Sequence, residues 1–80
     1  SGQEHQLAIV LSNLGLVLHD MGDHEAARVP LEESLEIRLR LGDQSGAAMA
    51  LNNLGLAYRG LGNRVRAEEV LREALSLAMD

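Results

Sequence analysis

Apolar residues recur every three or four positions in four successive stretches of the chain. This spacing places them on one face of a helix, and no stretch shows the strict alternation that is typical of a strand. Each junction carries a glycine, which suits a left-handed helix end, and then Asp or Asn, which suits the start of a helix. The junctions are Gly22-Asp23, Gly42-Asp43 and Gly62-Asn63. The pattern predicts four helices, over about residues 4–21, 24–41, 44–61 and 64–79.

Each predicted helix carries one apolar stripe. The first stripe contains Leu7, Val10, Leu11, Leu14, Val17, Leu18 and Met21, and the second contains Ala27, Leu31, Leu35 and Leu39. The third contains Ala47, Ala50, Leu51, Leu54, Ala57, Tyr58 and Leu61, and the fourth Ala67, Val70, Leu71, Ala74, Leu75 and Ala78. Pro30 lies within the second helix, where we expect a kink and not a break because the stripe continues past it. Gly60 should weaken the end of the third helix by about 1 kcal/mol relative to Ala.

The second half of the chain repeats the first half after a shift of forty residues. Residues 48–56 read Ala-Met-Ala-Leu-Asn-Asn-Leu-Gly-Leu, and residues 8–16 read Ala-Ile-Val-Leu-Ser-Asn-Leu-Gly-Leu. The same register relates Gly22 to Gly62, Ala27 to Ala67, Leu31 to Leu71, Glu33 to Glu73 and Leu35 to Leu75. A fixed period of this size indicates stacked repeats. We divide the chain into 1–7, a remnant and helix start, and two repeats, 8–41 and 42–80.

Composition narrows the function classes. With one Tyr and no Phe or Trp, Leu and Ala must build the core, and this favours an all-helical fold. The absence of Cys excludes disulfides, zinc–thiolate sites and thiol chemistry. A net charge of −5 argues against binding nucleic acid or an anionic membrane surface. No apolar run approaches the roughly 20 residues of a membrane span, and no signal peptide is recognisable, so we expect a cytoplasmic protein. We interpret Ser1-Gly2 as a remnant of expression and the chain as a fragment of something longer.

These repeats resemble the tetratricopeptide repeat, a helix–turn–helix unit with small and large apolar residues at fixed places. The first-helix signature is matched by Leu11, Leu14-Gly15 and Leu18, and again by Leu51, Leu54-Gly55 and Tyr58. The turn glycines match Gly22 and Gly62, and the second-helix positions match Ala27-Leu31-Ser34 and Ala67-Leu71-Ala74. The resemblance implies two antiparallel helical hairpins. Glycine and alanine should lie where the two helices of a hairpin cross, because larger side chains would force them apart.

The period departs from the usual 34 residues of this family. Six extra residues add roughly 9 Å of helix to each unit. In this respect the chain is similar to the forty-residue repeats of Leu-Gly-Asn scaffold proteins and of bacterial regulators. Some family members clamp C-terminal carboxylates with Lys and Arg on the groove helices, and the absence of Lys argues against that mode here.

The resemblance implies that the first helix of each repeat faces a concave groove. The expected ligand-binding residues there are Asn13, Asn53, Asn52, Ser12, Leu16, Leu56, His19 and Arg59. Asn is a mediocre helix former, so its recurrence at residues 13 and 53 needs a reason. Two amides about 10 Å apart could hold backbone groups three residues apart in an extended peptide. Alternatively, each Asn ties neighbouring helices together or was duplicated with its repeat.

Other candidate chemistry is weaker. His19, Asp23 and His24 surround the first turn, but a glycine separates them and we interpret them as exposed, solvated residues and not as a metal site. No nucleophile elbow or phosphate-binding loop is present, so we expect neither catalysis nor a cofactor. The arginines of the second and fourth helices alternate with glutamates and should form surface ion pairs: Arg28, Arg38, Arg40, Arg66 and Arg72.

Three functions fit this sequence. The first is a scaffold that binds a peptide or helix of a protein partner in its groove. The others are a ligand- or peptide-sensing repeat of a bacterial transcription regulator and a structural spacer in a longer superhelix. We also expect self-association, because two repeats leave apolar terminal helices uncapped. The copies could stack end to end, form a symmetric dimer through the terminal helices, or exchange hairpins across residues 41–46.

Overall fold

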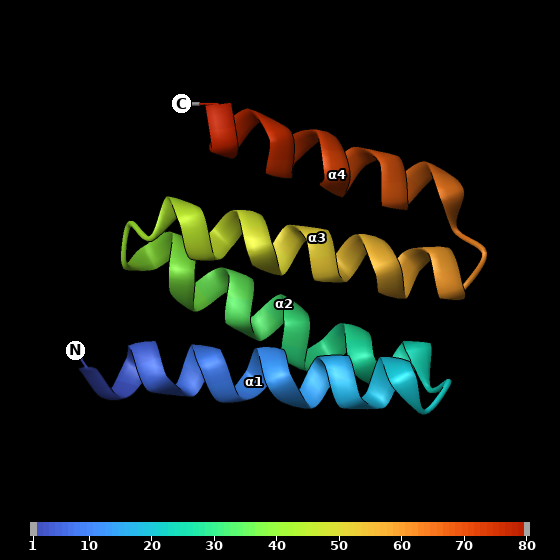
Figure 1. Ribbon diagram of the computed structural model, residues 1–80, viewed down its shortest axis with the longest axis horizontal. Helices are drawn as coiled ribbons and strands as arrows, with labels where there is room; N and C mark the ends of the chain where they lie inside the picture. Colours follow the sequence, from blue (N-terminus) through green and yellow to red (C-terminus); the bar gives the residue numbers. More distant parts are fainter. Residues whose placement is uncertain (1, 80) are drawn as a thin grey trace.

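The computed structural model describes residues 2–79. Four helices make up almost all of it: α1 (Gly2–Asp20), α2 (His24–Arg40), α3 (Gln44–Gly60) and α4 (Arg64–Met79). They form two antiparallel hairpins, and within the described residues no strand is present (Figure 1). The all-helical prediction is confirmed, and each helix begins and ends within two residues of its expected limits.

The three turns have the same construction. Gly22, Gly42 and Gly62 have φ angles of 86°, 74° and 79°, a left-handed conformation that glycine adopts without strain. The next residue donates its N–H to a carbonyl of the last helical turn, as in Asp43 N–H to Arg38 O at 2.9 Å. Its side chain then caps the following helix, as in Asp43 Oδ1, which accepts from Gly46 N at 2.9 Å. Equivalent bonds form at Asp23 and Asn63. Glycine therefore ends each helix and the Asp or Asn beside it starts the next.

The two hairpins close over glycines. A Cβ added to Gly15 would lie 2.5 Å from Leu31 Cγ, and one added to Gly55 would lie 2.9 Å from Leu71 Cδ2. The small residues of the predicted crossing are therefore in place in both repeats, because the leucine of the second helix occupies the space a side chain would need.

The core centres on α3. Its buried residues come from α2, α3 and α4: Leu31, Ala48, Leu51, Leu54, Ala57, Tyr58, Ala67, Val70 and Ala74. Each helix packs against the next one along the chain, and α1 also touches α3. Within residues 2–79, no Cα atom of α2 lies within 8 Å of one of α4. The first helices of the two repeats therefore converge on one face of the layer, and this face carries the candidate site.

The stripe predicted for α2 is partly wrong. The helix continues through Pro30, which is buried, and its other buried residues are Ala27, Leu31, Ser34, Ile37 and Arg38. Leu39, placed in the stripe by steps of four, is exposed. A helix turns every 3.6 residues, so strict steps of four leave the buried face after three steps. At the end of α2 the buried position is therefore occupied by Arg38 and not by Leu39.

Candidate partner-binding groove

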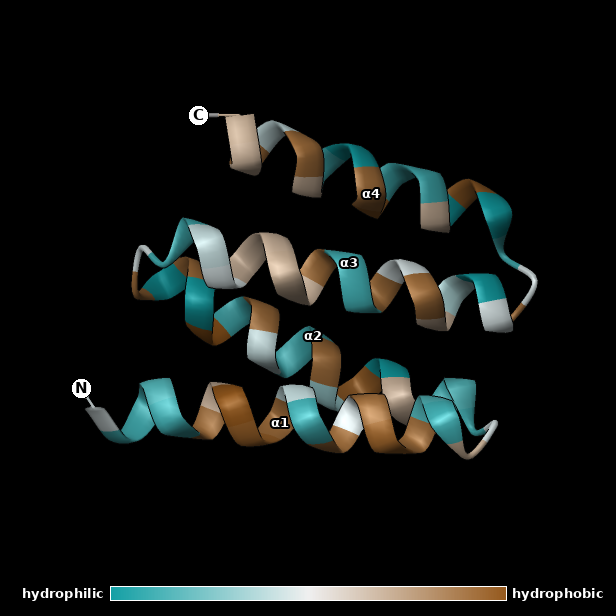
Figure 2. Cartoon of the chain, in the orientation of Figure 1, coloured by the Kyte–Doolittle hydropathy of each residue, from teal (hydrophilic) through white to brown (hydrophobic). Residues whose placement is uncertain are grey.

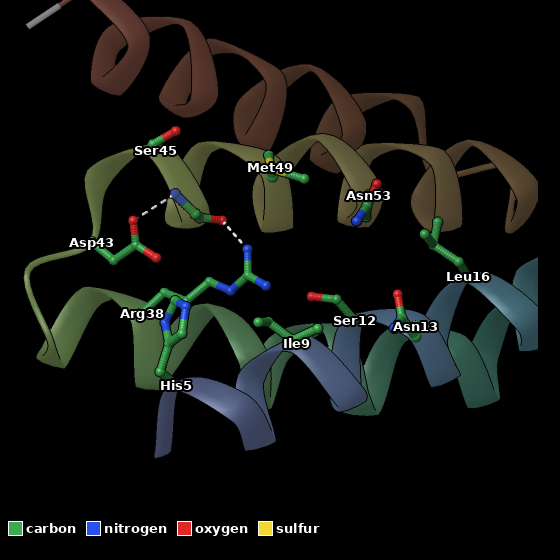
Figure 3. A pocket seen from close by; sticks show the side chains of 11 residues that line it. His5, Ile9, Ser12, Asn13, Leu16, Arg38, Asp43, Ser45, Met49 and Asn53 are labelled. Carbon is green, nitrogen blue, oxygen red and sulfur yellow. Dashed lines mark hydrogen bonds between the residues drawn. The ribbon is translucent and has the colours of Figure 1, made fainter. Parts of the chain in front are cut away.

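A groove of about 350 Å3 lies between α1 and α3, with the end of α2 contributing to it (Figure 3). α1 contributes five residues, and α3 and the turn before it contribute most of the others. The lining consists of His5, Ile9, Ser12, Asn13, Leu16, Arg38, Asp43, Ser45, Gly46, Met49 and Asn53. Apolar and polar side chains are therefore mixed along one hollow, with two amides, one carboxylate and one guanidinium among them.

Asn13 and Asn53 both line this groove, from α1 and α3 respectively. Asn13 is exposed and Asn53 is half-buried. Neither side-chain amide forms a hydrogen bond with another residue of the described range, although each can donate two and accept two. The amides do not tie the helices together, and their hydrogen-bonding groups are available to a ligand.

Ser12 lines the groove but is engaged in the fold. Its hydroxyl lies 2.8 Å from that of Ser34, which donates to the carbonyl of Ala8, also at 2.8 Å. Because Ser34 has only one hydroxyl hydrogen, Ser12 must be the donor between the two. This buried pair links α1 to α2, so Ser12 offers a ligand at most its acceptor lone pairs.

The other expected site residues are dispersed. Leu16 lines the groove, whereas Asn52 and Leu56 are exposed elsewhere on α3. Arg59 lines a second hollow of about 480 Å3, together with Arg64, Ala67, Glu68 and Leu71. The structure thus brings together four of the eight expected residues, namely Asn13, Asn53, Ser12 and Leu16.

His19 faces His24 and not the groove. Their Nδ1 atoms lie 2.9 Å apart, at hydrogen-bond distance, and their ring centroids lie 4.8 Å apart. The ring of His24 also occupies the space that a Cβ of Gly60 would need. Both rings are half-buried, so the expectation of exposed, solvated histidines is wrong. The physical reason is that His24, the first residue of α2, packs on Gly60 at the end of α3. No group of three potential metal ligands occurs among residues 2–79.

Arg38 is the lining residue whose position the sequence prediction missed. Only 6% of it is exposed, and its Nη1 donates to the carbonyl of Gly46 at 2.9 Å. Its Nε is buried without a partner, and it forms no ion pair within the described range. The predicted surface ion pair is therefore wrong for this arginine. The available signal was helical spacing, since residues 31, 34 and 38 share one face.

Three of the predicted ion pairs form away from the groove, whereas the pair predicted for Arg72 does not form within the described residues. Arg28 pairs with Glu25 and Glu32, Arg40 with Glu4 at 3.0 Å, and Arg66 with Glu69 at 3.8 Å. Hydrogen bonding to Arg28 lowers the pKa of Glu25, and the same two glutamates raise the pKa of Arg28. The hydrogen bond of Tyr58 is the main cause that raises the pKa of Arg66. The outer helices therefore carry a solvated, largely self-neutralised charge pattern.

The comparison with known families agrees with this geometry. The family model of the tetratricopeptide repeat matches residues 6–80. The chain belongs to the tetratricopeptide-repeat family. No curated protein and no solved structure matches it significantly. Tetratricopeptide repeats generally mediate protein–protein interactions and are typically non-catalytic. None of the helices described is both long and apolar enough to cross a membrane.

Proposed function

We propose that this tetratricopeptide-repeat chain is a scaffold module that binds an extended peptide segment of a protein partner in the groove between α1 and α3. The observation that supports this most directly is the pair of unpartnered amides, Asn13 and Asn53, on two adjacent inner helices at one groove. An extended backbone offers alternating donors and acceptors that side-chain amides match. Ile9, Leu16 and Met49 supply apolar surface beside them.

The shape of the site favours a peptide over a small sensory ligand. Pockets for small molecules usually enclose 70–90% of the ligand surface. Here Ile9, Asn13 and Met49 are themselves exposed, so the groove is an open channel along the helices. An open channel suits a ligand that continues beyond it at both ends.

Selection from a random peptide library displayed on phage tests the proposal. Peptides enriched on the 80-residue chain should lose most of their binding to an Asn13→Ala, Asn53→Ala double variant. Asn52→Ala is the matched control, because this neighbouring Asn lies outside the groove lining and is exposed. Equal binding by the double variant, with helical circular dichroism intact, would place the binding surface elsewhere.

We also propose that copies of the chain stack head to tail, α4 of one against α1 of the next. These two helices form the edges of the layer (Figure 1). Figure 2 shows many hydrophobic residues along α1. Along α1 and the turn after it, five large apolar residues are exposed: Leu7, Val10, Leu14, Val17 and Met21. The matching positions of α3 are Ala47, Ala50, Leu54, Ala57 and Leu61, and the first four of these are buried. Leu71, Leu75 and Met79 of α4 are exposed in the same way.

The repeat register also matches charges across this stack. Within the chain, His24 of α2 packs on Gly60 of α3. A shift of forty residues replaces these two residues by Arg64 on α4 and by Asp20 on the next copy's α1. Opposite charges would therefore meet at the place where an imidazole meets a glycine within the chain.

Sedimentation velocity over a concentration series tests the stacking. Asp20→Arg and Arg64→Asp should each weaken association, and the double exchange should restore it. The exchange of Glu36→Arg and Arg40→Asp, at exposed positions of α2, is the control and should have little effect, because α2 forms neither edge of the layer (Figure 1). A monomer at every concentration, or a double exchange no better than the single variants, would contradict this arrangement.

A further inference from the structure

Arg38 carries a positive charge that forms no ion pair within residues 2–79. Its guanidinium has five N–H donors, and one accepting partner, the carbonyl of Gly46, is present within residues 2–79. A buried charge without a counter-charge is costly, and such groups are usually paired or serve a ligand. The arginines that do pair with carboxylates, such as Arg28 and Arg40, lie on the outer surface.

The guanidinium points into the groove. Figure 3 shows it between α1 and α3, directed toward Ser12, with Asp43 and Ser45 at one end of the hollow and Asn13, Asn53 and Leu16 at the other. Asp43 forms no ion pair with this guanidinium, and its Oδ1 instead accepts the N–H of Gly46. Gly46 makes this packing possible, since a Cβ there would lie 2.9 Å from Cδ of Arg38 and would also overlap the carboxylate of Asp43.

The repeat unit itself does not require this arginine. Its equivalent forty residues later is Ala78, and the equivalent of Gly46 is Gln6. The pair therefore belongs to this one groove and not to the general construction of the repeat.

We propose that Arg38 recognises the side-chain carboxylate of a glutamate in the bound peptide. This deepens the proposed peptide-binding function and rests on it. Carboxylate oxygens match the planar fork of a guanidinium. The guanidinium lies below the exposed edge of the groove, with Asn13 and Asn53 nearer the surface, so a long side chain reaches it while the peptide backbone stays with the amides. The lining holds no second arginine and no lysine, and a single guanidinium suits one negative charge better than a phosphate dianion.

The first test uses small probes on the full chain labelled with 15N. N-acetyl-glutamate N-methylamide should shift the Nε–H resonance of Arg38 and the amide of Gly46, and N-acetyl-glutamine N-methylamide should not. Inorganic phosphate and acetate, added at the same ionic strength, show how the Arg38 resonances respond to anions that are not part of a peptide. Arg38 resonances that respond equally to the Glu and Gln probes would overturn the proposal, and so would a stronger response to phosphate.

The second test uses pentapeptides with blocked ends, Leu-Ser-Glu-Ser-Leu and its Gln analogue. The Glu peptide should bind at least about tenfold more tightly, as expected for a charge-assisted hydrogen bond. Arg38→Gln should abolish this preference, and Arg40→Gln, an exposed arginine outside the groove lining, should keep it. Arg38→Met, which keeps the apolar stem, replaces Arg38→Gln if that variant loses helicity.

The outcomes separate this inference from the proposed function. Equal binding of both peptides, lost in the Asn13→Ala, Asn53→Ala variant, would refute the role of Arg38 and leave the groove as the peptide site. A further peptide is the Gln analogue with a free C-terminus. If Arg38 strengthens binding of this peptide but not of the Glu peptide with blocked ends, the ligand is a terminal carboxylate and the side-chain assignment is wrong. A selective response of Arg38 to the small Glu probe, without peptide binding, would retain the carboxylate site and reject the groove as a peptide channel.

Discussion

α1 and α3 share one sequence pattern but differ in how much of each helix is buried. Both carry the Leu-Gly-Leu segment, at residues 14–16 and 54–56, with an Asn before it. α3 lies between α2 and α4 and buries nine residues, whereas α1 packs mainly on α2 and buries Ala8, Ser12 and Gly15. Burial in a stacked repeat is therefore a property of the neighbours and not of the sequence unit.

The two helices also differ in how they are attached to their hairpin partners. In the first repeat, Ser12 and Ser34 form a buried hydroxyl pair. In the second repeat the matching residues are Asn52, which is exposed, and Ala74, which is buried. The first hairpin thus has a buried polar contact in addition to its apolar packing, and the second has apolar packing at that place, so equivalent substitutions should have unequal effects.

The largest expected effect comes from Leu54→Ala compared with Leu14→Ala. Leu54 is 2% exposed and Leu14 is 48% exposed, although they occupy the same repeat position. Leu54→Ala should lower the free energy of unfolding by about 2–5 kcal/mol through the cavity it leaves. Leu14→Ala should change it by roughly 0.5 kcal/mol or less. Urea denaturation at low protein concentration measures both, and similar losses would show that α1 is covered in solution.

The next effect concerns Gly15→Ala and Gly55→Ala. We expect Gly15→Ala to lower the free energy of unfolding, and Gly55→Ala to leave it unchanged or raise it. The new methyl group at Gly15 meets Leu31, which is fully buried, and lies 3.2 Å from the carbonyl of Ala27. This variant should lose about 1–3 kcal/mol from overpacking. At Gly55 the neighbour is Leu71, which is 38% exposed and can move aside. Here the higher helix propensity of Ala, which stabilises a helix by up to about 1 kcal/mol relative to Gly, should offset the cost of the contact with Leu71.

Thermal unfolding of the two alanine variants beside the wild type provides the measurement. A lower midpoint for Gly15→Ala and an unchanged or higher midpoint for Gly55→Ala is the expected result. Equal destabilisation would mean that Leu71 is held as firmly as Leu31, as it would be under a stacked neighbour.

The smallest expected effect is a pH dependence of the stability that Glu25 contributes, and it is expected in the first repeat but not in the second. Glu25 hydrogen-bonds Arg28, and the matching residues of the second repeat are Val65 and Glu68. Because folding lowers the pKa of Glu25 from 4.5, its stabilising contribution is present above that value and is lost as the pH falls through the folded-state pKa. Glu25→Gln should therefore lower the urea midpoint slightly at pH 7 and leave it unchanged at pH 2. A difference that persists at pH 2 would show that the effect does not come from ionisation.

The candidate site was predictable only in part. Asn13, Asn53 and Leu16 could be placed at the groove because the forty-residue register and the family resemblance assign α1 and α3 to the inner face. Leu56 occupies the register position of Leu16 in the second repeat, yet it lies outside this groove because no third inner helix faces it within the described residues. Half of a repeat-protein groove is formed by the neighbouring unit, which a position within one repeat does not reveal.

The sequence alone determined the four helices, their turns and their pairing into hairpins. These features depend on local chemistry: the apolar period of a helix, the left-handed conformation of Gly22, Gly42 and Gly62, and the capping side chains that follow them. Tertiary structure alone decided that Leu54 is buried while Leu14 is not, and that Arg38 lines the groove without forming an ion pair within the described residues. Burial and charge pairing depend on which residues distant in the chain meet in space, and a helical period of 3.6 residues leaves that choice to the packing of neighbouring helices.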